Sequence, residues 1–194
     1  MLTKRELIDF ESDIVQLFLD KKILSPIHLS KGNETQLISI FKKIKPDDWV
    51  FSTHRSHYHA LLKGIPKLWL RNEILYNRSI HIYNKEYKFF TSAIVGGILP
   101  IALGTALAIK RKGSKEQVWC FVGDMAASGG IFSECTKYAG GWELPIHFII
   151  EDNGFSTDTP TNKVWGPGEF GPYLKVYEYK RGYPHVGVGK WVTF

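Results

Sequence analysis

Two apolar runs constrain the fold of this chain most strongly: VWCFV at residues 118–122 and IHFII at residues 146–150. Each has the length and apolar content of a buried strand, and the first predicts a strand over 117–122. A helical pattern over about 130–140 lies between them. A strand, a crossover helix and a second buried strand form a parallel βαβ unit, whose strands end at the same edge of the sheet. The sequence therefore predicts an α/β fold with a parallel sheet flanked by helices.

Start and stop signals predict further elements around this unit. Thr3 and Glu6 have the spacing of a capping box ahead of an amphipathic pattern, which indicates a helix at the start of the chain. The other expected elements are a helix over 33–45 ended by Pro46, a short strand over 49–53, and a helix over 99–113 closed by Gly113. We expect one domain over residues 1–194, in which the stretch 158–194 stays unassigned.

Composition limits the class of protein. The chain is 44% hydrophobic and 23% charged, which is typical of a globular domain. No apolar run approaches the roughly 18 residues that span a bilayer, and the first residues lack the apolar stretch of a signal peptide. The net charge of +6 is spread over small basic groups, which most often lie on solvated faces. We therefore expect a cytoplasmic protein that binds neither membranes nor nucleic acids.

Polar side chains follow the two strands of the βαβ unit. Asp124 comes after the first strand and Asn153 after the second, so both are expected at one edge of the sheet, where open α/β sheets bind ligands. Carboxylate and amide oxygens suit Mg²⁺, and the amides of Met125 and Ala126 suit the phosphates that such a cation bridges. The alternative is that Asp124 is a helix cap or a loop residue.

A longer match extends this pattern. The segment 123–157, GDMAASGGIFSECTKYAGGWELPIHFIIEDNGFST, resembles the thiamine diphosphate motif of 2-oxoacid dehydrogenase alpha subunits, with 153 − 124 = 29 positions between acid and asparagine. The stretches similar to other segments of that family, in the same order, are 27–34, 53–64, 79–83 and 93–113. The chain is identified by this resemblance, over about 20–157, as an alpha-type subunit with a thiamine diphosphate-binding fold.

The resemblance implies a ligand set for the cofactor and its metal. Asp124 and Asn153, with the carbonyl of Phe155, would hold Mg²⁺. The guanidinium of Arg55 would hold the diphosphate, for which its planar fork is suited.

The resemblance also implies contacts at the other end of the cofactor. The backbones of Ala93 and Val95 would meet the aminopyrimidine ring, and His28 and His57 would stand near the substrate carboxylate or the reacting carbon. For either histidine the alternative is an ordinary core or surface residue.

The sequence departs from the family pattern at several positions. Met125 replaces the second glycine of the motif, and its side chain requires a negative φ there. Asp152 replaces the first asparagine, and His54 stands in place of a tyrosine that contacts the diphosphate. The family loop that carries a histidine and a regulatory serine has no counterpart here.

The resemblance finally implies a partner and a reaction. Family alpha subunits lack the glutamate that activates the cofactor, and a beta-type chain supplies it, so we expect a hetero-oligomer that decarboxylates a 2-oxo acid. Two alternatives stay open: a split transketolase or carboligase that passes a carbon unit to an aldehyde, and a non-catalytic binding or structural subunit.

Overall fold

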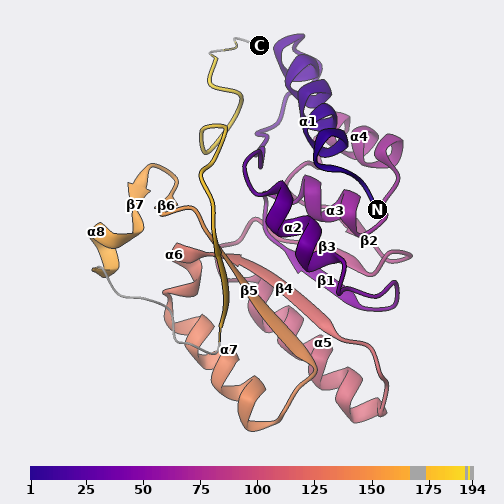
Figure 1. Cartoon of the computed structure of the whole chain (residues 1–194), viewed down its shortest axis with the longest axis vertical. Helices are drawn as coiled ribbons and strands as arrows, with labels where there is room; N and C mark the ends of the chain where they lie inside the picture. Colours follow the sequence, from indigo (N-terminus) through magenta and orange to yellow (C-terminus); the bar gives the residue numbers. More distant parts are fainter. Residues whose placement is uncertain (167–173, 191, 193–194) are drawn as a thin grey trace.

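The fold is built on a six-stranded sheet in the order β2-β3-β1-β4-β5-β8 (Figure 1). The computed structural model describes residues 1–166, 174–190 and 192. The strands are β1 (Trp49–Ser52), β2 (Tyr83–Asn84), β3 (Phe89–Thr91), β4 (Val118–Gly123), β5 (Ile146–Asp152) and β8 (Lys175–Glu178). All neighbours pair in parallel except β2 and β3. The predicted α/β fold with a parallel sheet is confirmed.

Helices cover both faces of this sheet. The helices are α1 (Lys4–Leu19), α2 (Glu34–Phe41), α3 (His57–Leu62), α4 (Lys67–Leu75), α5 (Ile98–Lys112), α6 (Asp124–Ala127), α7 (Gly130–Gly141) and α8 (Thr161–Trp165). Figure 1 shows α1 to α4 on one side of the sheet and α5 and α7 on the other. A separate hairpin of β6 (Phe155–Ser156) and β7 (Thr159–Pro160) precedes α8.

Strand β4 divides the core into two halves. Trp119 and Phe121 pack in the cluster formed with α1 to α4, whereas Val118, Cys120 and Val122 pack in the cluster formed with α5 and α7. Alternate side chains of a strand point to opposite faces. The strand therefore reads as one continuous apolar run because both of its faces are buried.

The expected helix ends agree with the structure in most places. Thr3 and Glu6 form the predicted capping box, and Gly113 ends α5 in the left-handed conformation with φ +65°. The predicted helix over 33–45 is wrong at its end, since α2 stops at Phe41. Its last residues form tight turns instead, and the amide of Lys45 is taken by Asp48. No helix in the described ranges has the length and hydropathy needed to cross a membrane.

Asp48 joins the starts of β1 and β4. Its carboxylate is buried, and it accepts hydrogen bonds from the amide of Gln117 at 2.9 Å, the amide of Lys45 at 3.0 Å and the indole Nε1 of Trp119 at 3.2 Å. Three donors, one in the turn before β1 and two at the start of β4, thus share one buried acceptor.

We predict that Asp48→Ala lowers the free energy of unfolding by about 2–4 kcal/mol, because it leaves buried donors without an acceptor. Urea denaturation followed by circular dichroism measures this change. Asp47→Ala is the matched control. Asp47 is exposed, and its carboxylate oxygen lies 3.9 Å from the Nζ of Lys88, so the free energy of unfolding should change little. Equal effects of the two substitutions would contradict the role given to Asp48.

Candidate functional site

A pocket opens at the carboxyl edge of the sheet, beyond the ends of β1, β4 and β5. Its empty volume is about 760 Å³, part of which is open solvent. Five segments line it: residues 53–55; residues 92–96 with Ile98; residues 122–126; Glu151, Asn153 and residues 155–157; and Tyr179, Arg181 and His185 of the C-terminal stretch. The register pairs Gly123 with Glu151, so Asp124 and Asn153 both emerge from the sheet here. Their predicted placement at one edge is confirmed.

Asp124 is a buried carboxylate at the base of this pocket. Only 1% of the residue is exposed, and the carboxylate accepts a hydrogen bond from the hydroxyl of Thr161. Burial, with a smaller contribution from the charge of Asp152, raises the pKa of Asp124, whereas the Thr161 bond lowers it. Asp124 is the first residue of α6, and the N-cap is Gly123. A bound cation would offset the cost of burying this charge.

Asn153 and Phe155 lie on the loop that leaves β5. The Asn153 Oδ1 accepts the amide of Phe155 at 3.1 Å, and its Nδ2 donates to the hydroxyl of Tyr179 at 3.3 Å. An amide oxygen has a second lone pair, so Oδ1 keeps the capacity to coordinate a cation. Asp124, Asn153 and Phe155 all line the pocket. Hard oxygens of this kind are the donors that Mg²⁺ takes.

Met125 fits the site without backbone strain. It lies inside α6 and is not among the described non-glycine residues that have a positive φ. The backbone therefore meets the requirement for a negative φ at this position, where the family motif has glycine. Its sulfur accepts the indole Nε1 of Trp165 at 3.1 Å, so Met125 connects α6 to α8. Met125 and Ala126 both line the pocket.

Exposed apolar side chains also line this pocket. Ala93, Ile94 and Val95 line the pocket. The contact of the Ala93 and Val95 backbones with the aminopyrimidine ring stays a prediction. Ile94 is 72% exposed and Val95 is 80% exposed. Large aliphatic side chains with this exposure beside a pocket are typical of a surface that another molecule covers.

Arg55 lines the pocket and also holds its walls together. The buried guanidinium donates to the carbonyl of Leu29 and, through Nη2, to the carbonyl of His185 at 3.1 Å. Guanidinium has five N–H donors, so it has the capacity to bind an anion in addition to these two carbonyls. Burial lowers the pKa of Arg55, while the charges of Glu11 and Glu151 raise it.

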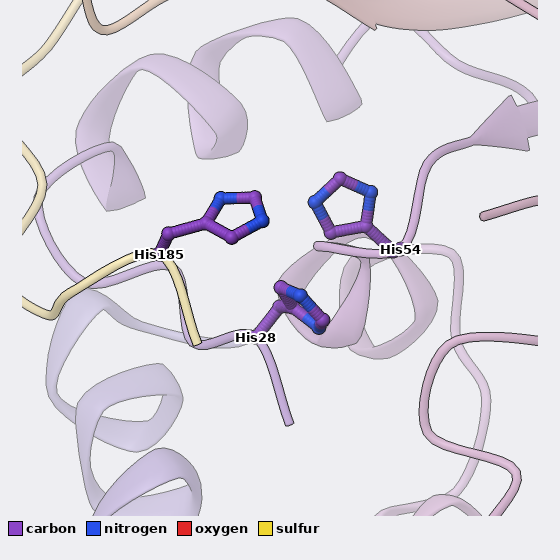
Figure 2. Close-up of side chains that lie close together, drawn as sticks. All are labelled: His28, His54 and His185. Atoms are coloured by element: carbon purple, nitrogen blue, oxygen red, sulfur yellow. The ribbon is translucent and has the colours of Figure 1, made fainter. Parts of the chain in front are cut away.

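The two histidines predicted near the reaction lie in different surroundings. His28 is buried directly behind the pocket wall, with ring centroids 4.4 Å from His54 and 5.0 Å from His185 (Figure 2). His57 is fully buried in the core, and its Nε2 lies 2.9 Å from the Ser79 hydroxyl. Neither lines the pocket. The expected place of His57 beside the substrate gains no support, because its ring packs as the core alternative describes.

Burial lowers the pKa values of the histidines of this wall. Burial, followed by the charge of His54, lowers the pKa of His28 to about 2. Burial, followed by the charge of Arg55, lowers the pKa of His54 to about 4 and also lowers that of His185.

The sequence did not identify the residues that the C-terminal stretch brings to the site. Thr161 bonds to Asp124, and Tyr179, Arg181 and His185 line the pocket. Their segment has no regular spacing of apolar residues, and the unassigned residues 167–173 lie outside the described part of the chain. The density of aromatic and basic side chains was the one available signal.

Comparisons with known proteins show the family of the chain. A family model described as "Dehydrogenase E1 component" matches residues 3–165. Similar proteins include the alpha subunit of the pyruvate dehydrogenase E1 component of Porphyra purpurea (30% identity, covering 75% of this chain and 47% of the relative). The alpha subunit of acetoin:2,6-dichlorophenolindophenol oxidoreductase of Bacillus subtilis is 32% identical over 80% of this chain and 50% of its own.

A human relative covers more of the chain. It is the testis-specific mitochondrial form of the pyruvate dehydrogenase E1 alpha subunit, 31% identical over 91% of this chain and 48% of its own. The chain thus spans about half the length of the curated relatives it matches.

We predict that Arg55→Ala lowers the free energy of unfolding by about 1.5–3 kcal/mol, because two carbonyls lose a charged donor. Thermal and urea melts of the protein without ligand measure the loss. Arg5→Ala is the control, since the Arg5 side chain is 90% exposed and its pair with Asp9 is 3.8 Å long. If Arg55→Ala melts like the parent protein, Arg55 does not hold the pocket walls.

Proposed function

Because the chain belongs to the dehydrogenase E1 component family, we propose that it is the alpha-type subunit of a thiamine diphosphate- and Mg²⁺-dependent enzyme that decarboxylates a 2-oxo acid. One observation carries the proposal: buried Asp124 and the amide of Asn153 share a pocket with Arg55 at the carboxyl edge of a parallel sheet. This edge is where such sheets bind ligands.

The donor set fits a divalent cation with a diphosphate. Asp124, Asn153 and the Phe155 carbonyl would supply hard oxygens, and the diphosphate and water would supply the remaining ligands. Arg55 and Arg181 bring two positive charges to the same pocket. Arg181 donates to the carbonyl of Thr157 at 3.0 Å and is thereby fixed beside the β6–β7 hairpin.

The residues of this chain would bind and orient, while the cofactor carries the reaction. When bound, thiamine diphosphate supplies the carbon nucleophile that adds to the substrate carbonyl and accepts the electrons left by carbon dioxide. Asp124 and Asn153 would fix the metal, and with it the diphosphate end. The backbones of Ala93 and Val95 would position the pyrimidine end, and buried His28 would set the polarity of the wall behind the substrate.

A second chain would complete the site. Ile94 and Val95 expose large aliphatic side chains at the rim, and Phe155 is exposed on the facing hairpin. A beta-type chain that covers this rim would bury them and bring the glutamate that activates the cofactor. The names of two relatives contain different substrates, pyruvate and acetoin, so both stay candidates for this chain.

We predict that Asp124→Asn abolishes the Mg²⁺-dependent stabilisation by thiamine diphosphate, because the cation loses its carboxylate ligand. Thermal melts of the chain assembled with its partner, with and without both ligands, measure this effect. Asp158→Asn is the matched control, since Asp158 is an exposed acid in the β6–β7 turn. Unchanged cofactor affinity in folded Asp124→Asn would overturn the metal assignment.

We also predict that the chain alone is inactive and that activity appears when it is mixed with the beta-type chain. Purified single and mixed chains should be assayed for carbon dioxide release from 2-oxo acids and for reduction of an artificial electron acceptor with pyruvate or acetoin. Transfer of the carbon unit to an added aldehyde instead would indicate the carboligase alternative. Full activity from this chain alone would contradict the half-site proposal, and a folded, inactive mixture that binds the cofactor would favour a binding subunit.

A further inference from the structure

Three imidazoles from distant parts of the sequence meet at the pocket wall. His28 lies in the loop after α1, His54 follows β1, and His185 lies in the C-terminal stretch. One ring nitrogen from each lies within 4.8 Å of the other two. Figure 2 shows the three rings arranged around a common space.

The spacing of these nitrogens suits a small cation. A tetrahedral Zn²⁺ with Zn–N distances of about 2.1 Å holds its nitrogens about 3.4 Å apart. Nitrogens at most 4.8 Å apart would therefore close by no more than about 1.4 Å. Side-chain rotations of His54 and His185, which are both half-buried, can supply this movement.

A buried ring atom lacks the partner that its chemistry requires. The Nδ1 of His28 is buried and has no hydrogen-bond partner in the structure, although only 7% of the residue is exposed. Buried polar atoms are nearly always satisfied, and a bound water or ion is one explanation of an exception. Neutral imidazole presents a nitrogen lone pair, which is the form of histidine that binds metals.

We propose that His28, His54 and His185 bind one transition-metal cation, with Zn²⁺ as the preferred ion and the fourth position toward the pocket. Imidazole selects Zn²⁺ and its neighbours in the first row, whereas carboxylate and carbonyl oxygens select Mg²⁺. The site is therefore chemically distinct from the oxygen donors of Asp124, Asn153 and Phe155. It shares no ligand with the oxygen site, so a metal titration tests it separately from the proposed function, in which His28 forms part of the wall behind the substrate.

The backbone prepares this arrangement. The amide of Gly182 donates to the carbonyl of Lys31 at 2.7 Å, and the amide of Gly187 donates to the carbonyl of Ile27 at 2.9 Å. His185 lies between Gly182 and Gly187 in the sequence, and His28 lies between Ile27 and Lys31, so the two bonds flank both histidines. The ligands are thus held close before any cation arrives, which lowers the entropic cost of binding.

Nearby charges act in both directions. Arg55, which donates to the His185 carbonyl, opposes a second positive charge, and it also disfavours protonation of the same rings. Buried Glu151 attracts positive charge to His54. The coordination bonds to three nitrogens must outweigh the repulsion between the cation and Arg55. Because the site has no carboxylate ligand, it should select metals that prefer imidazole over Mg²⁺.

The test uses Co²⁺ as a spectroscopic probe and then Zn²⁺ as the competitor. The metal-free full chain should bind one equivalent of Co²⁺ with the visible absorption of a low-coordinate nitrogen site, and one equivalent of Zn²⁺ should remove it. His28→Ala, His54→Ala and His185→Ala should each weaken binding at least about tenfold, since even the loss of an outer-shell partner costs roughly 10–100-fold. His81→Ala, which removes an exposed histidine, should bind like the parent.

Further variants separate this site from the oxygen site and from misfolding. Asp124→Asn should retain the Co²⁺ spectrum, and a large excess of Mg²⁺ should not displace the ion. His185→Gln accompanies the alanine variant, and metal-free circular dichroism selects the variants that fold. The proposal is overturned by the absence of stoichiometric binding, or by binding that survives all three histidine substitutions and is lost in Asp124→Asn.

Discussion

The parallel pairing of β4 with β5 is the contact on which the site depends. Six register pairs join the two strands, from Val118 with Ile146 to Gly123 with Glu151. Both faces of β4 are buried, so a shift by one residue would exchange the side chains of the two core clusters. The core thereby fixes the register, and the register places Asp124 beside the loop that carries Asn153.

The sequence predicted this central unit because its signals are local. Apolar runs, a crossover of sufficient length and a capping box are readable over short windows, and β4, α7, β5 and the start of α1 agree with them. The end of α2 was missed because Asp48, a residue outside the helix, takes the amide of Lys45. Strand β8 was missed because its residues are largely exposed, so its sequence lacks the apolar run of an inner strand.

The candidate site was predictable only where it follows the strand ends. Asp124 and Asn153 could be placed from the topology of the sheet. The direction of a side chain at the start of a short helix could not be predicted in this way: His57 points into the core, while nearby Arg55 faces the pocket. The contacts of His28 and Arg55 with His185 join segments that share no sequence signal. Tertiary hydrogen bonds to backbone carbonyls decide such contacts, and any residue can supply a carbonyl.

The backbone bonds between the C-terminal stretch and residues 27–31 have a consequence for the order of folding. Gly182 and Lys31 are 182 − 31 = 151 positions apart, whereas the pairs of β4 and β5 are 146 − 118 = 28 positions apart. Closing the longer loop costs more chain entropy before any contact stabilises it. The sheet can therefore form first, and the wall that carries Tyr179 and His185 closes over a pocket floor already in place. During refolding, secondary structure would then form before the protein regains the capacity to bind a ligand.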